Sequence, residues 1–195
     1  MASKRESSFL NMVLTLSVVA VVAALALGSV YVVTKAPIAR AQKKKQEAAI
    51  KAVLPPFDRV KALKVPDADG NDSLLFNVAT KGGKLVGVAV NTFTDKGFGG
   101  RIDAMVGFLP DGTIYNTSIL SLKETPGLGT KLQKSKSDFP DQFKGKNPKT
   151  FKLKVKKDGG DVDAITAATI SSRAFCDAVQ RAYDTFEKQK SRIHQ

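Results

Sequence analysis

The chain has 195 residues, 43% hydrophobic and 25% charged, so it is long enough for one domain with a small appendage, and global disorder is excluded. Its one cysteine, Cys176, excludes an internal disulfide and a four-thiolate iron–sulfur cluster, and its one histidine, His194, leaves no base for a Ser-His-Asp mechanism. The net charge of +13 would suit nucleic acid, but no zinc-finger spacing or RNP-like aromatic motif supports that partner, and none is expected.

The first predicted element is a transmembrane helix over residues 12–33, after a short N-terminal tail of residues 1–11. Its 22 residues carry no formal charge, and a helix of that length rises about 33 Å, enough to cross a hydrocarbon core of about 30 Å. A cleaved signal peptide would have a shorter apolar region, about 7–15 residues, and a small-residue cleavage site. The basic residues that follow favour an anchor in contact with anionic membrane lipid. The positive-inside rule is weak for a long domain, so charge alone leaves the orientation open.

Residues 34–56 are predicted as a linking helix. Pro37 lies near its start, the residues after it are rich in alanine, and Pro55-Pro56 ends it. The Lys43–Lys45 run is expected to be a solvated helix face at the membrane surface. The folded domain is then predicted over residues 57–195.

The folded domain is predicted to contain strands followed by a last helix. Turns are expected at Lys81–Gly83 and at Asp111-Gly112, the latter as a two-residue hairpin. The last helix is predicted over Ser171–Lys190, with Cys176 packed in the core as a small apolar residue. The fold class is therefore α+β, with a mostly antiparallel sheet and flanking helices. The predicted strands are Leu74–Val78, Lys84–Thr92, Ile102–Leu109, Thr113–Leu122 and Phe151–Val155.

Three segments have residue types that suit a ligand. Gly97–Gly100 by itself is typical of a flexible loop. Glu124–Lys131 contains two glycines beside a proline, which lets backbone approach a flat ligand closely, although alone it indicates only a turn. Asp161–Ser172 leads into the last helix, where hydroxyl and acidic residues are typical of capping, but where free amides also stabilise a phosphate.

In this order and behind one anchor, the three segments resemble the FMN-binding domain family. The resemblance covers nearly the whole chain and is greatest to the G subunit of Rnf-type ion-translocating electron transport complexes, a relative of the C subunit of the sodium-pumping NADH:quinone reductase. In that family a flavin transferase esterifies FMN to the last threonine of Asp-x-x-(Ser/Thr)-Gly-Ala-Thr. The resemblance makes Thr169 the covalent acceptor, and Ala167 departs from the glycine of the motif. The other matching positions are Asp163, Thr166 and Ala168.

The resemblance also implies roles for the glycine-rich segments and for the protein. Gly99 and Gly100 would shape the surface beside the flavin. The chain would be an electron-transfer subunit that does not turn over alone, with the other membrane subunits of its complex and the flavin transferase as partners. Its domain would lie on the periplasmic side of the bacterial inner membrane. Four residues would lie against the isoalloxazine ring: Glu124, Thr125, Gly127 and Leu128.

Two alternatives remain at this point. A non-redox assembly or adaptor subunit would use the same anchor and domain to hold partners, and Ala167 is the feature that favours it. A stand-alone flavin reductase or sensor would work without partner subunits, but the chain lacks a nicotinamide-binding fingerprint.

Overall fold

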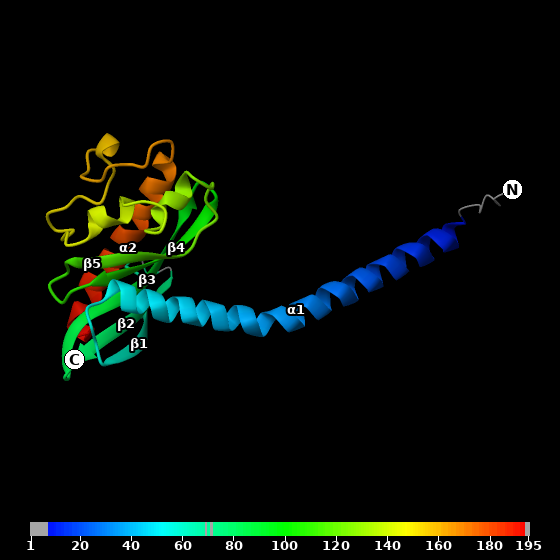
Figure 1. Ribbon diagram of the computed structural model, residues 1–195, viewed down its shortest axis with the longest axis horizontal. Helices are drawn as coiled ribbons and strands as arrows, with labels where there is room; N and C mark the ends of the chain where they lie inside the picture. Colours follow the sequence, from blue (N-terminus) through cyan, green and yellow to red (C-terminus); the bar gives the residue numbers. More distant parts are fainter. Residues whose placement is uncertain (1–7, 69, 71, 194–195) are drawn as a thin grey trace. The chain divides into compact units, whose positions relative to one another are not determined.

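The computed structural model describes residues 8–68, 70 and 72–193 (Figure 1). Residue contacts divide the chain into two units, one that ends at Lys44 and one that begins at Lys45. Within the described ranges there are two α-helices, α1 (Phe9–Val53) and α2 (Thr169–Ile193), and five strands. Three short 3₁₀ helices lie between the last strand and α2: η1 (Gly129–Leu132), η2 (Phe139–Phe143) and η3 (Lys156–Asp158).

Helix α1 is one continuous helix of 45 residues, where the sequence predicted two. Pro37 lies inside it, although proline lacks an N–H and opposes the helix interior by about 3 kcal/mol. The residues after Pro37 are mostly Ala, Lys, Gln and Glu, whose high helix propensity favours continuation. Residues 1–7 of the predicted tail lie outside the described residues, and α1 already includes Phe9–Asn11.

The N-terminal part of α1 has the properties of a membrane span. It is long and apolar enough to cross a bilayer by length and composition, and its apolar stretch is not buried in the chain. A signal sequence near an N-terminus meets the same criterion. The exposed leucines and valines of this stretch need an apolar environment that the described chain does not supply.

The second unit is built on a sheet in which each strand pairs with the next, in the order β1-β2-β3-β4-β5, and every pair is antiparallel. With the two helices, this confirms the predicted α+β class. The sequence missed β1 because it is an edge strand in which six of eight residues are exposed, and only Leu63 and Val65 contact the core. The strands are β1 (Arg59–Pro66), β2 (Ser73–Lys81), β3 (Lys84–Gly97), β4 (Gly100–Phe108) and β5 (Ile114–Ser121).

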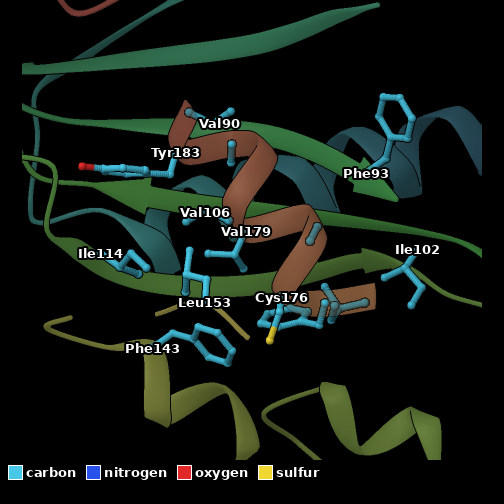
Figure 2. Close-up of a cluster of buried hydrophobic side chains, with 14 of the residues drawn as sticks. Val90, Phe93, Ile102, Val106, Ile114, Phe143, Leu153, Cys176, Val179 and Tyr183 are labelled. Carbon is cyan, nitrogen blue, oxygen red and sulfur yellow. The ribbon is translucent and has the colours of Figure 1, made fainter. Parts of the chain in front are cut away.

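Helix α2 covers one face of this sheet and forms the main core. Figure 2 shows Cys176, Val179 and Tyr183 of α2 among apolar side chains of the strands, including Val90 and Val106. The chain between β5 and α2 adds further apolar side chains to the same cluster, so the core fixes the start of α2 relative to the sheet.

The opposite sheet face is covered by the end of α1, which belongs to the second unit from Lys45 onward. Ala49, Val53 and Leu54 pack there in a second apolar cluster. The close approach depends on Gly107 of β4, since a Cβ at that position would lie 1.7 Å from the carbonyl oxygen of Val53. The end of α1 is therefore an integral part of the folded domain.

Two local predictions were wrong. Phe151–Val155 is not a strand, because its backbone bonds mostly to the loop that follows, and only an isolated bridge joins Val155 to Val162. The β4–β5 connection is longer than a two-residue hairpin. Leu109 N–H donates to the Thr113 carbonyl, and only Gly112 has a positive φ, +93°. The apolar residues of Phe151–Val155 indicated a buried segment, but its backbone is not that of a strand. The Asp111-Gly112 pair indicated a turn between β4 and β5, but the turn is longer than two residues.

Cys176 is buried as predicted, with 3% of its surface exposed. Burial raises the pKa of its thiol to about 12, so the reactive thiolate is scarce at neutral pH. We expect the native full-length chain not to react with an aromatic disulfide reagent at pH 8, and the denatured chain to release one equivalent of chromophore. Release of one equivalent from the folded protein at a comparable rate would contradict this placement.

Candidate functional site

The three segments singled out in the sequence meet at one cavity of about 330 Å³. One wall comes from the turn between β3 and β4, the second from the loop after β5, and the third from the start of α2. This is within the range of about 300–1,000 Å³ that is usual for small-molecule sites. Its lining residues are Phe98, Glu124, Thr125, Leu128, Gly129, Ala167, Ala168, Thr169, Ile170 and Ser171.

Glu124 joins the three walls. Its carboxylate is almost fully buried, with 6% of the residue exposed. One oxygen, Oε1, accepts a hydrogen bond from Gly99 N–H at 3.1 Å, and the other, Oε2, accepts one from the Ser171 hydroxyl at 2.6 Å. Gly129 completes the packing, because a Cβ there would lie 2.4 Å from Oε2. The loop after β5 is thus tied to both the β3–β4 turn and α2.

The start of α2 is fixed by a turn and by Ser172. Ala168 N–H donates to the Ile165 carbonyl at 2.9 Å, which closes a four-residue turn just before the helix. The Ser172 hydroxyl accepts from Ile165 N–H at 2.9 Å and donates to the Ala168 carbonyl at 3.0 Å. These bonds pair the N–H and carbonyl groups of Ile165 and Ala168, at the two ends of the turn, and hold Thr169 as the first residue of α2.

The first backbone N–H groups of α2 are free to bind an anion. Those of Thr169, Ile170 and Ser171 have no hydrogen-bond partner within the described part of the chain. Arg173, one turn further on, is already engaged: its Nε and one terminal nitrogen each donate to Asp158 at 2.7 Å, which lowers the pKa of that carboxyl. Stabilisation of an anion at this end therefore comes from the amides and the helix dipole.

Ala167 has a backbone conformation that favours glycine. Its φ is +61°, and it is the one non-glycine residue with positive φ among those described. It occupies the third position of the turn from Ile165 to Ala168, where a type II turn requires positive φ. The departure from the glycine expected at this position thus introduces strain of about 1 kcal/mol, and the turn retains its form.

Replacing Ala167 by glycine is expected to raise the free energy of unfolding by about 0.5 kcal/mol, since relief of the left-handed strain exceeds the added freedom of the unfolded chain. Thermal unfolding of the detergent-solubilised full chain, followed by circular dichroism, should show a rise of about 1–2 °C. Ala62→Gly is the matched control: Ala62 is exposed in β1 without positive φ, so this change should lower stability. A destabilised Ala167→Gly variant would contradict the assignment of strain.

The cavity has an apolar rim, defined here as Phe98, Leu128 and Ile170. Their exposed fractions are 69%, 37% and 49%. In the described part of the second unit only one other large apolar side chain, Val60, is comparably exposed. An apolar cluster of this kind marks a site of binding. A flat, partly apolar group that carries a phosphate fits the rim on one side and the free amides of α2 on the other.

Half of the predicted site residues line the cavity: Glu124, Thr125, Leu128, Ala168 and Thr169. The other half lie outside its lining. Gly99 contributes its N–H to Glu124, whereas Gly100 and Gly127 have positive φ at turns. Asp163 and Thr166 are exposed, and the Asp163 carboxylate pairs with Lys156 at 2.8 Å.

The sequence did not single out the remaining lining residues as individual contacts. Ser171 and Gly129 were missed because their importance lies in contact with Glu124, which depends on the tertiary fold. Ile170 has a local signal that was available: it is an apolar residue that interrupts hydroxyl-bearing neighbours at a helix start. Phe98 has a similar one, as the single large side chain among four residues of which three are glycine.

Comparison with known proteins agrees with this geometry. Residues 97–184 match the family model described as the FMN-binding domain, a range that begins at the β3–β4 turn and ends within α2. The G subunit of an ion-translocating oxidoreductase complex from Cereibacter sphaeroides is 32% identical over 198 residues, 96% of this chain and 89% of that protein. This chain belongs to the family of G subunits of ion-translocating oxidoreductase complexes.

Two other relatives with the same name match this chain over a shorter region. The protein from Shewanella piezotolerans is 38% identical over 119 residues, 60% of this chain and 56% of the relative. The protein from Erwinia tasmaniensis is 43% identical over 107 residues, 53% of this chain and 51% of the relative. The chain thus spans about half the length of these two relatives. The resemblance stated from the sequence is confirmed, and the domain match supports FMN as the ligand.

Proposed function

We propose that this protein is an electron-transfer subunit of a membrane-bound ion-translocating oxidoreductase complex, and that it carries FMN as a phosphoester on the Thr169 hydroxyl. The observation that supports this most directly is the position of Thr169, which is both the first residue of α2 and part of the cavity lining. A phosphate on its Oγ would be next to the free amides of the helix start and the positive end of the helix dipole.

Each wall of the cavity has a role in this proposal. FMN, when bound, supplies reversible acceptance of electrons. Phe98, Leu128 and Ile170 line the cavity and would exclude water from the flat ring system of the bound cofactor. Glu124 and Ser171 hold the walls in place through their hydrogen bond. Covalent attachment keeps the cofactor on the chain, which then acts as a fixed relay between partners.

The ester would be formed by a flavin transferase that uses FAD. The Thr169 oxygen attacks the phosphorus of the FMN half and loses its proton, and the bond to AMP breaks, so that AMP leaves and no oxidant or reductant is needed. The side chain of Thr169 is half-buried and adjoins the open cavity, which is compatible with access by an enzyme.

The membrane arrangement is part of the proposal. Residues 12–33 would span the bacterial inner membrane once. Residues 34–56 would link the span to the FMN-binding domain, residues 57–195, with the end of this link packed on the sheet as part of the folded unit. The domain would lie on the periplasmic side. The other membrane subunits of the complex, the flavin transferase and membrane lipid would be the partners. The protein would not turn over alone.

The test is covalent flavin in the full-length chain, produced in a host with and without a flavin transferase. After denaturing electrophoresis we expect a band fluorescent under ultraviolet light only with the transferase, and mass spectrometry should locate one FMN on the peptide that contains Thr169. A dark band in the presence of active transferase would contradict the proposal. The adaptor function, favoured by the strained Ala167, would then be the better assignment.

A further inference from the structure

A second segment of the domain is strongly basic. Residues 144–157 contain seven lysines and no acidic residue, and all seven lysines are exposed. This lysine row follows η2 and reaches into η3, and its side chains do not line the cavity at Thr169. Its members are Lys144, Lys146, Lys149, Lys152, Lys154, Lys156 and Lys157.

The backbone of the lysine row is held in place by the core. Leu153 and Val155 are buried in the main apolar cluster, and Phe151 packs against it. At the other end of the row, Gly145 N–H donates to the Ile114 carbonyl at 2.7 Å, and Ile114 N–H donates to the Lys146 carbonyl at 2.9 Å. The apolar residues alternate with lysines, so Lys152, Lys154 and Lys156 are presented to solvent by an ordered segment.

Most lysines of the row form no ion pair with a described residue. Within the described ranges Lys149 pairs with Glu187 at 3.5 Å and Lys156 pairs with Asp163 at 2.8 Å. The other five lysines form no ion pair with a described carboxylate. A lysine just outside the row behaves differently: Lys134 contacts two aspartates at 2.5 Å each. Like charges concentrated in this way repel one another and favour an anionic surface as partner.

We propose that the lysine row binds the anionic head groups of the phospholipid bilayer. The proposal requires that α1 is in the membrane, as proposed above, but it does not depend on bound flavin. The row contains only lysine, a hydrated point charge that suits fluid phosphate groups, whereas protein interfaces are enriched in arginine and depleted of lysine. A tethered domain also has a high effective concentration at the bilayer surface.

The experiment uses the full-length chain in nanodiscs of phosphatidylcholine, with or without one third phosphatidylglycerol. The rate of lysine acetylation is measured by mass spectrometry. Because each basic residue near an anionic surface adds on the order of a fivefold preference, the five unpaired lysines should react at least about fivefold more slowly in the anionic discs. Protection should be lost near 1 M salt, where the screening length falls to about 3 Å.

Three lysines outside the row serve as internal controls: Lys61, Lys64 and Lys84. They are exposed on β1 and β3 and form no ion pair with a described residue. Their acetylation rates should not differ between the two kinds of nanodisc. The triple variant Lys152→Glu, Lys154→Glu, Lys157→Glu should remove protection of Lys144 and Lys146. The triple variant Lys61→Glu, Lys64→Glu, Lys84→Glu changes the net charge by the same amount but should retain the protection of Lys144 and Lys146. The pair of variants thus distinguishes an effect of the lysine row from an effect of net charge.

Equal rates in the two kinds of nanodisc would overturn the proposal. So would protection that appears only when other subunits are bound, whatever the lipid, because the partner would then be an acidic protein. Sedimentation of the discs with the chain verifies membrane insertion, and flavin fluorescence is recorded separately. Failure of the flavin proposal and failure of lipid binding are therefore distinguishable.

Discussion

Replacing Thr169 by valine is expected to abolish the covalent flavin of the protein completely. Valine keeps the shape and the β-branch of threonine but removes the hydroxyl that would form the ester. Because the residue is only half-buried and its hydroxyl forms no hydrogen bond with a described residue, the fold should be retained. Denaturing electrophoresis with ultraviolet detection would show a fluorescent wild-type band and a dark variant band of equal protein content.

Thr166→Val tests the competing acceptor. The Thr166 hydroxyl lies three residues earlier, is exposed, and is not part of the cavity lining. We expect this variant to keep a fluorescent band, with FMN still on the peptide that contains Thr169. The reverse pattern, a bright Thr169→Val and a dark Thr166→Val, would move the ester to Thr166 and leave the position of the cavity without explanation.

The elements that the sequence predicted well are those whose signal is local. Four strands were found because they are rich in apolar and β-branched residues. The Lys81–Gly83 turn was found because Gly82 and Gly83 supply the positive φ of a tight hairpin. The last helix was predicted from Ser171, and α2 begins two residues earlier at Thr169. Covalent attachment at Thr169 came from resemblance and remains a prediction.

The features that the sequence did not predict depend on distant contacts. Edge strand β1 has little buried surface, so its pattern is weak, and its pairing with β2 becomes evident only in the sheet. Phe151–Val155 has strand-like alternation, yet no strand of the sheet lies beside it to pair with. Pro37 is compatible with a helix start and, at a cost, with a helix interior, so proline alone did not decide between one helix and two.

The same distinction applies within the site. Glu124 was predicted as a residue lying against the flavin ring, because the segment that contains it resembles the family. The structure adds a second role that spacing cannot reveal, since Gly99 and Ser171 are 25 and 47 residues away along the chain. A buried carboxylate that bonds to both stabilises the cavity before any ligand arrives, so Glu124 should matter for the stability of the domain as well as for flavin attachment.

Glu124→Ala is expected to lower the free energy of unfolding by about 3 kcal/mol, because it leaves Gly99 N–H and the Ser171 hydroxyl without partners and opens a gap beside Gly129. The melting temperature of the full chain, followed by circular dichroism, should fall by about 6–12 °C. Flavin attachment in the presence of the transferase should also fall, because the walls on either side of Thr169 are no longer held together.

Glu124→Gln separates this positioning role from a need for the carboxylate itself. The glutamine oxygen can still accept from Gly99 N–H, and its amide can donate to the Ser171 oxygen, so both links are retained in altered form. We therefore expect a loss of about 1 kcal/mol or less and nearly normal fluorescence of the flavin band. If Glu124→Gln loses flavin attachment as Glu124→Ala does, while the variant protein keeps normal stability, the negative charge of Glu124 acts on the flavin directly. If Ala is as stable as wild type, the joint between the three walls does not stabilise the domain, and the site is held by the core contacts of α2 alone.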